Sequence, residues 1–132
     1  MRSKDKTTAS TARILNRLER LYGKCFCQIF KTITVDNGCE FANPEILEKS
    51  CVYKGKRTKF YYCHSYSSWE RGSNENANRI IRRCIPKGIP ISRFSDSDIA
   101  TVQAYINAIP RAILGDRTAA SLFENELSKI AP

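Results

Sequence analysis

The sequence predicts an α/β fold with few β-strands and about five helices. Three observations support this prediction: helical periodicity over residues 7–22, a run of β-branched residues at 30–35 that ends at Asp36, and three further helical segments in the second half of the chain. The chain has 132 residues, and we expect a single domain over residues 1–132.

The first predicted helix runs from Thr7 to Tyr22 and is amphipathic. Its apolar residues recur at helical spacing, and Gly23 is suited to the C-cap position. Such a helix needs a sheet or another helix to cover its apolar side. The apolar residues are Ile14, Leu15, Leu18, Leu21 and Tyr22.

A short helix and a hairpin are predicted after the strand. Asn43 is expected to cap the helix, with Pro44 at its first position. Residues 51–53 and 58–62 flank the basic turn 54–57, which favours a β-hairpin. One strand and a hairpin are too few to cover the apolar faces of five helices, so we expect further strands of the sheet to precede Met1.

Three helices are predicted in the second half of the chain, each starting at a residue that can cap it. These residues are Ser73, Ser95 and Thr118, and Ser95 forms a capping-box pattern with Asp98. Proline and glycine residues between the helices predict loops. The expected last residues are Arg83, Ala108, which Pro110 follows closely, and Leu127.

The composition favours a globular chain with an anionic partner. Hydrophobic residues make up 42% and charged residues 27% of the sequence. Lys and Arg number 22 against 13 Asp and Glu, and the net charge of +9 fits nucleic acid binding and a merely basic protein equally well. Because we find no apolar run of roughly 20 residues and no apolar signal sequence, we expect a cytoplasmic protein without a membrane partner.

The six cysteines do not follow a common metal-binding pattern. The closest pair, Cys25 and Cys27, is separated by one residue, whereas structural zinc sites use Cys-x-x-Cys pairs. A zinc site is therefore the less favoured alternative, and reduced thiols are expected.

Two carboxylates stand where chemistry could occur. Asp36 follows a strand and precedes Gly38, and Glu75 lies in the first turn of a predicted helix. Together they could hold Mg²⁺ or Mn²⁺, since hard divalent ions prefer oxygen ligands. The alternative is a turn-forming Asp and a Glu that stabilises a helix N-terminus, and spacing alone favours that alternative.

Four motifs, in order, resemble the transposases of the insertion-sequence-30 family. Residues 34–42 (TVDNGCEFA) are similar to the motif of the second catalytic Asp, and residues 66–78 (YSSWERGSNENAN) are similar to the motif of the final Glu. Residues 85–88 resemble the segment after that helix. Residues 107–111 and 118–123 resemble the closing pattern.

The resemblance implies an RNase H-like integrase core of the DDE type that lacks its first strands. Such a core cuts and joins DNA at transposon ends and target sites with two Mg²⁺ or Mn²⁺ ions held by Asp, Asp and Glu. Asp36 corresponds to the second Asp and Glu75 to the Glu. The first Asp is expected on a strand before the first helix, so the chain alone is expected to be catalytically incomplete.

The alternative is a non-catalytic basic remnant that binds DNA or the full-length transposase, and a homo-oligomer is a further possible assembly. Asn37, Gly38, Trp69 and Asn78 are expected to support the two carboxylates, although core packing is an alternative role for Trp69. Either DNA-phosphate contacts or a solvated basic surface would explain the cationic candidates, which are Arg71, Arg79, Arg82, Arg83, Lys54, Lys56 and Arg57.

Overall fold

The computed structural model describes residues 5–64 and 72–130. Contacts between residues divide the chain into two compact units, and each is described by itself below. The first unit contains described residues 5–64, and the second contains residues 72–130. The mixed α/β class predicted from the sequence is confirmed, while the prediction of one domain over residues 1–132 stays a prediction.

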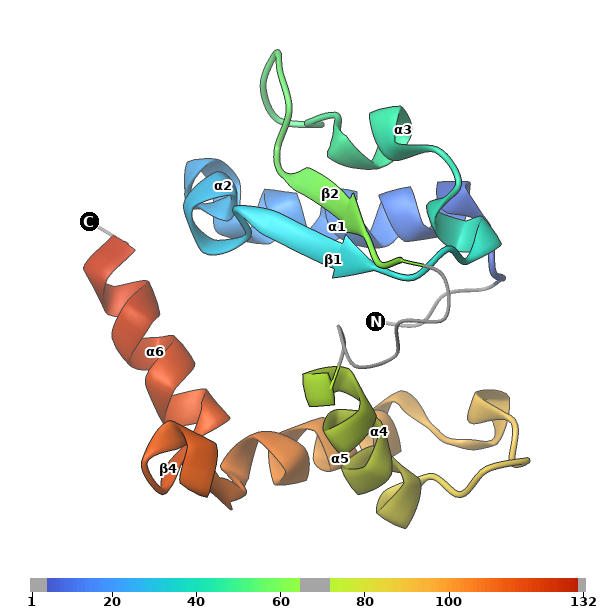
Figure 1. The fold of residues 1–132 in the computed structure, drawn as a ribbon, viewed down its shortest axis with the longest axis vertical. Coiled ribbons are helices and arrows are strands. Elements are labelled where there is room, and N and C mark those ends of the chain that lie inside the picture. The colour runs from blue at the N-terminus through green and yellow to red at the C-terminus, as the bar shows by residue number, and fades with distance from the viewer. Residues whose placement is uncertain (1–4, 65–71, 131–132) are drawn as a thin grey trace. The chain divides into compact units, whose positions relative to one another are not determined.

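The first unit packs helices on one face of a small parallel sheet (Figure 1). The sheet pairs β1 with β2 in parallel, with Ile33 opposite Phe60 and Val35 opposite Tyr62. The helices and strands are α1 (Thr8–Tyr22), α2 (Phe26–Ile29), β1 (Thr32–Val35), α3 (Pro44–Glu48) and β2 (Lys59–Tyr62), with short 3₁₀ helices at Gly23–Cys25 and Cys39–Phe41.

Capping residues set the helix boundaries of the first unit; the caps at Gly23 and Asn43 were predicted, and the one at Thr7 was not. The Thr7 side chain accepts a hydrogen bond from the Ser10 N–H at the start of α1. Gly23 ends α1 with a φ of 55°, a conformation that glycine adopts without a Cβ clash. Asn43 Oδ1 accepts from the Ile46 N–H at 3.3 Å, and Pro44 begins α3 as predicted.

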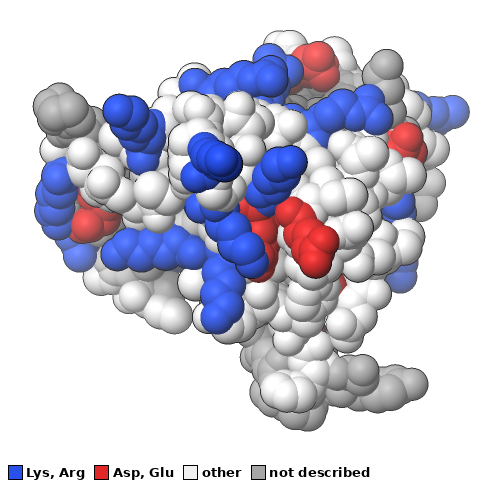
Figure 2. All heavy atoms as spheres, turned by 90° about the horizontal axis from the view of Figure 1, so that it is seen from above, with Lys and Arg blue, Asp and Glu red and all other residues white. Residues whose placement is uncertain are grey.

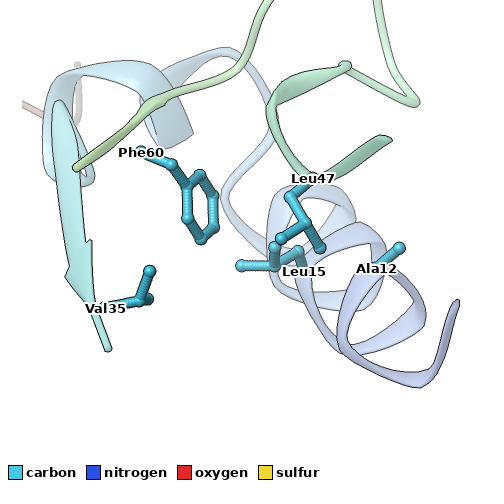
Figure 3. Close-up of a cluster of buried hydrophobic side chains, with 5 residues drawn as sticks. All are labelled: Ala12, Leu15, Val35, Leu47 and Phe60. Atoms are coloured by element: carbon cyan, nitrogen blue, oxygen red, sulfur yellow. The ribbon is translucent and has the colours of Figure 1, made fainter. Parts of the chain in front are cut away.

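The hydrophobic core of the first unit joins α1, α3 and the sheet. Figure 3 shows Val35 and Phe60 of the two strands facing Leu15 of α1 and Leu47 of α3, with Ala12 beside them. All five side chains are buried. Full burial of a Val, Leu or Phe side chain contributes roughly 1.5–3 kcal/mol. The cluster buries Ala12 and Leu15 of α1, whereas Leu21, which was predicted on the apolar side of this helix, is 69% exposed.

The predicted hairpin is wrong. Residues 51–53 form no strand, and β2 pairs in parallel with β1, leaving only an isolated antiparallel bridge between Lys49 and Lys56. The loop instead satisfies its backbone through Ser50. The Ser50 Oγ accepts from the N–H groups of Val52 and Tyr53 at 3.1 and 3.0 Å. Because the Ser50 hydroxyl accepts hydrogen bonds from these backbone N–H groups, they do not require a neighbouring strand as acceptor.

A buried ion pair ties this loop to α1. Arg57 is 1% exposed and Glu19 is 0% exposed, and their Nη1 and Oε2 atoms lie 3.2 Å apart. Arg57 Nε also donates to the Leu47 carbonyl at 2.8 Å, and Nη1 donates to Asn16 Oδ1. The guanidinium therefore connects α1, the end of α3 and the loop.

The carboxylates of Glu19 on α1 and Glu48 on α3 accept further hydrogen bonds. Glu19 accepts from Ser50 Oγ and from the Cys51 N–H at 2.9 Å. Glu48 accepts from Lys56 Nζ at 2.7 Å and from the Phe60 N–H at 2.9 Å. The burial of Glu19 is thus offset by several donors, as buried charges require.

The second unit is mostly helical. Helix α5 contacts both α4 and α6, and β3 pairs antiparallel with β4. Ile85 is buried, but other apolar side chains are not covered: Ile113 is 87% exposed and Tyr105 is 51% exposed. The elements are α4 (Gly72–Cys84), α5 (Asp96–Ala108), β3 (Pro110–Arg111), β4 (Arg117–Thr118) and α6 (Ala119–Ile130), with short 3₁₀ helices at Ile91–Arg93 and Ala112–Leu114.

Two of the three predicted starts in the second unit are confirmed. Ser95 and Asp98 form the capping box, with both reciprocal hydrogen bonds present. Thr118 Oγ1 accepts from the Ser121 N–H at 3.1 Å in the first turn of α6. The prediction for Ser73 is wrong, because α4 already begins at Gly72 and Ser73 lies within the helix.

Replacing Arg57 by Met should lower the free energy of unfolding by about 3–5 kcal/mol, because the substitution leaves Glu19 as a buried charge without its cation. Urea denaturation measures the loss. Lys54→Met, an exposed change in the same loop, should stay within about 0.5 kcal/mol of the original protein. If Arg57→Met combined with Glu19→Leu is no more stable than Arg57→Met alone, the orphaned charge is not the cause.

Stability should fall at acid pH. Hydrogen bonds from Lys56 and Phe60 lower the pKa of Glu48, and the pKa of Glu19 is also lowered because its hydrogen bonds outweigh the opposing effect of burial. A lowered folded-state pKa contributes stability above the ordinary Glu pKa of about 4.3, and this stability is lost as pH falls through the lowered value.

Glu48→Gln should therefore destabilise the protein by about 1–3 kcal/mol at pH 7 and by less at pH 3, as measured by urea midpoints. Glu45→Gln in the same helix is the matched control, since Glu45 is exposed. An equal loss at both pH values for Glu48→Gln would contradict the linkage.

Candidate functional site

Asp36 lies at the carboxyl end of β1, where the chain turns. Its Oδ1 accepts from the Gly38 N–H at 3.2 Å, closing a local turn. Asn37 Nδ2 donates to the Cys63 carbonyl at 3.2 Å, and the Cys63 N–H donates to the Val35 carbonyl at 2.9 Å. The segments that follow β1 and β2 are therefore held together at one edge of the sheet, the edge where open α/β sheets place their sites.

Gly38 allows a second carboxylate to approach this turn. A Cβ added at Gly38 would lie 2.7 Å from Glu40 Oε2 and 3.1 Å from Asp36 Oδ1. The φ of Gly38 is −66°, so space and not backbone conformation is what favours glycine here. The structure thus brings Glu40 beside Asp36.

Sequence reasoning did not assign Glu40 a role. The feature of the sequence that could have indicated Glu40 is its position shortly after Asp36. The 3₁₀ helix Cys39–Phe41 carries the Glu40 side chain back over Gly38. Two neighbouring carboxylates form an anionic group at the end of β1, and oxygen ligands of this kind suit hard divalent cations.

Glu75 lies in the first turn of α4 with its side chain exposed. The exposed side of the helix also carries Arg79, whose Nη2 donates to Asn76 Oδ1 at 2.9 Å. Its inner side is apolar, and Ile80 and Ile81 are partly buried there. Amphipathicity therefore orients α4 so that its polar residues face solvent. The remaining predicted site residues on that exposed side are Asn78, Arg82 and Arg83.

The convergence of Asp36 and Glu75 on one ion stays a prediction. Asp36 belongs to the first unit and Glu75 to the second, and the units are described separately. Within residues 5–64 and 72–130 no group of three or more His, Cys, Asp or Glu side chains is placed to hold a metal ion. Trp69 and Arg71 lie outside the described residues.

The basic loop of the first unit is divided between exposed and buried cations. Lys54 and Lys56 are exposed, and Lys56 pairs with Glu48. Arg57 is buried against Glu19, where it forms part of the structure of the unit, and its predicted DNA contact stays a prediction. Its spacing in a Lys-rich run gave no sign of this, because the partner Glu19 lies on another element.

Basic side chains are more prominent than acidic ones on the face drawn in Figure 2. Lys and Arg cover more of that face than Asp and Glu do, and near its centre acidic side chains lie directly beside basic ones. This distribution agrees with the net charge of +9 and favours an anionic partner. None of the helices in the described part of the chain is long and apolar enough to span a membrane.

Comparison with curated proteins found transposases of bacterial insertion sequences. The chain is 40% identical over 102 residues to the transposase for insertion sequence element IS4351 of Bacteroides fragilis, a match that covers 76% of this chain and 29% of that protein. It is 34% identical over 97 residues to transposase InsI for element IS30A of Escherichia coli K12, a match that covers 74% of this chain and 24% of that protein. It is 31% identical over 84 residues to the transposase for insertion sequence element IS1086 of Cupriavidus metallidurans. That match covers 64% of this chain and 23% of that protein.

These matches cover most of this chain but only about a quarter of each relative. No protein-family model matches the sequence. No solved structure matches it either.

Gly38→Ala should displace the Glu40 side chain from the Asp36 turn, because the new methyl group would lie 2.7 Å from Glu40 Oε2. The cost should be small, roughly 1 kcal/mol, since the end of a Glu side chain can move away. In a Glu40→Ala background the same change should cost less, as measured by a double-mutant cycle in urea. Equal costs in the two backgrounds would show that the two side chains do not meet.

Proposed function

We propose, on the premise that this chain is an IS30-like transposase sequence, that it contributes two of three metal-binding carboxylates to a DDE-type core that cuts and joins DNA. In this proposal the fold is an RNase H-like integrase core. Its first Asp comes from a strand outside these 132 residues. The chain spans about a quarter of its curated relatives, so the activity belongs to the whole transposase.

The position of Asp36 is the observation that carries the proposal. Its carboxylate stands at the carboxyl end of a strand in a parallel sheet, and the Gly38 N–H fixes its orientation. Asn37 supports the turn by its hydrogen bond to the Cys63 carbonyl. Such a side chain is held by rigid elements and exposed to a substrate, which is what a metal-binding residue requires.

The residues fit a divalent metal by their chemistry. Asp36 and Glu75 would hold the ions, and carboxylate oxygens are ligands that Mg²⁺ and Mn²⁺ prefer. When bound, two such ions polarise the phosphodiester and stabilise both the attacking and the leaving oxygen. Glu40, beside Asp36, adds negative charge that favours cation binding at the same edge.

The exposed face of α4 is proposed to meet the DNA that Glu75 acts on. Arg79, Arg82 and Arg83 follow Glu75 on this helix and are exposed. Their charges would offset the phosphate repulsion that the carboxylates create. We propose DNA at transposon ends and target sites as the partner, and a homo-oligomer as the acting form.

Charge replacement should abolish metal-dependent cleavage in a chimera. In the chimera this chain replaces the matched segment of the Bacteroides fragilis transposase. Asp36→Asn and Glu75→Gln should each lower the rate of cleavage of insertion-sequence ends in Mg²⁺ or Mn²⁺ on the order of 100-fold or more, because a metal ion supplies several kcal/mol to the transition state.

Glu45→Gln is the matched control, since Glu45 is an exposed carboxylate on α3 outside the proposed site. The chimera with this change should cleave at the unaltered rate. Full activity in Asp36→Asn or Glu75→Gln would overturn the metal-binding roles. A chimera that binds the ends but never cleaves would favour a non-catalytic DNA-binding remnant instead.

A further inference from the structure

We propose that a basic hollow in the first unit binds a phosphate group, and that under the proposed function this group belongs to the DNA backbone. The hollow has a volume of about 360 Å³ and is open to solvent. It lies between α2, the end of α3 and the start of the two strands. Its lining residues are Cys27, Lys31, Glu48, Lys56, Arg57, Thr58 and Lys59.

The lysines of the hollow supply more positive charge than its one acidic residue offsets. Glu48 is the one acidic residue of the lining, and its oxygens accept from Lys56 Nζ and the Phe60 N–H. Lys56 thereby neutralises Glu48. Lys31 and Lys59 remain, both exposed, and among the described residues neither forms a salt bridge.

The backbone places Lys31 and Lys59 side by side. The Lys59 N–H donates to the Lys31 carbonyl at 3.3 Å, at the amino end of the parallel pair. Lys59 Nζ lies 4.9 Å from the centroid of the Tyr61 ring, a contact that positions the ammonium without neutralising it. Both lysines line the hollow, and ammonium groups from two strands can bind the oxygens of one phosphate.

Two buried donors on residues that line the hollow add capacity for an anion. Arg57 Nη2 and Thr58 Oγ1 are buried, and neither has a hydrogen-bond partner within the described part of the chain. Both residues line the hollow, and Arg57 is 1% exposed. Because unsatisfied buried donors are costly, an acceptor oxygen entering the hollow would gain hydrogen bonds that the protein alone leaves unmade.

The hollow is separate from the Asp36 edge. Lys31 and Lys59 lie at the amino ends of β1 and β2, and Asp36 follows the carboxyl end of β1. A strand rises about 3.3 Å per residue, so the two positions are on the order of 15 Å apart. A duplex advances about 3.4 Å per nucleotide of each strand, and the hollow would contact a phosphate roughly four or five nucleotides from the one at Asp36.

The first test compares the DNA affinities of variants of this 132-residue chain. Affinity is measured by fluorescence anisotropy of a labelled duplex over a range of salt concentrations. Lys31→Gln with Lys59→Gln should raise Kd roughly three- to tenfold and reduce the salt slope by about one. The control, Lys24→Gln with Lys87→Gln, removes the same charge from exposed lysines outside the hollow. Equal effects of the two double variants on Kd and slope would overturn a DNA contact at the hollow.

The second test separates DNA from a small phosphate ligand. Cys27 is exposed and lines the hollow, so its alkylation by iodoacetamide, followed by peptide mass spectrometry, reports occupancy. Duplex DNA should slow alkylation several-fold, and Lys31→Gln with Lys59→Gln should remove that protection. Protection by inorganic phosphate alone would assign the hollow to a small phosphate ligand. Protection by neither overturns the phosphate site.

The inference rests on the proposed function only for the source of the phosphate. If the chimera fails to cleave DNA while duplex still protects Cys27, the catalytic proposal fails and the hollow remains a DNA contact. If the chimera cleaves and neither DNA nor inorganic phosphate protects Cys27, the hollow proposal alone fails.

Discussion

The buried Arg57–Glu19 pair is the constraint on which the first unit depends. Both charges are almost completely removed from solvent, and such burial is tolerated only where hydrogen bonds replace the lost water. The required partners come from α1, from the Leu47 carbonyl at the end of α3 and from the loop around Ser50. A single guanidinium therefore fixes the relative positions of three segments that are distant in sequence.

This constraint also shapes the sheet. The Arg57 side chain is buried at the end of the loop, and the chain after it continues into β2. Strand β2 lies beside β1 and runs parallel to it. Phe60 then points into the core against Leu15, while Lys59 is left on the exposed side. Parallel pairing brings Asp36 and the segment around Cys63 to one edge and the lysines to the other. The same packing thus creates an acidic edge and a basic hollow from one short sheet.

The similarity to IS30-like transposases, together with the proposed function, gives these two features a common context. A carboxylate edge suits metal-dependent phosphodiester chemistry, and a basic hollow suits the polyanion on which such chemistry acts. The charges of the loop that contains Arg57 differ in location, because Arg57 is buried and the lysines of the loop are exposed. Lys54 and Lys56 remain on the surface, whereas the buried guanidinium acts by holding the walls of the hollow in place.

The sequence by itself determined several local features of the chain, although the strand predicted at residues 51–53 and the cap predicted at Ser73 were wrong. Asn43 and Ser95 were identified as caps, and Asp36 was placed at the end of a strand, because capping and turn formation depend on neighbouring residues. Tertiary structure decided the pairing of β2 with β1, the burial of Arg57 and the approach of Glu40 to Asp36. These depend on partners far along the chain or on three-dimensional space around Gly38, and residue spacing does not encode either one.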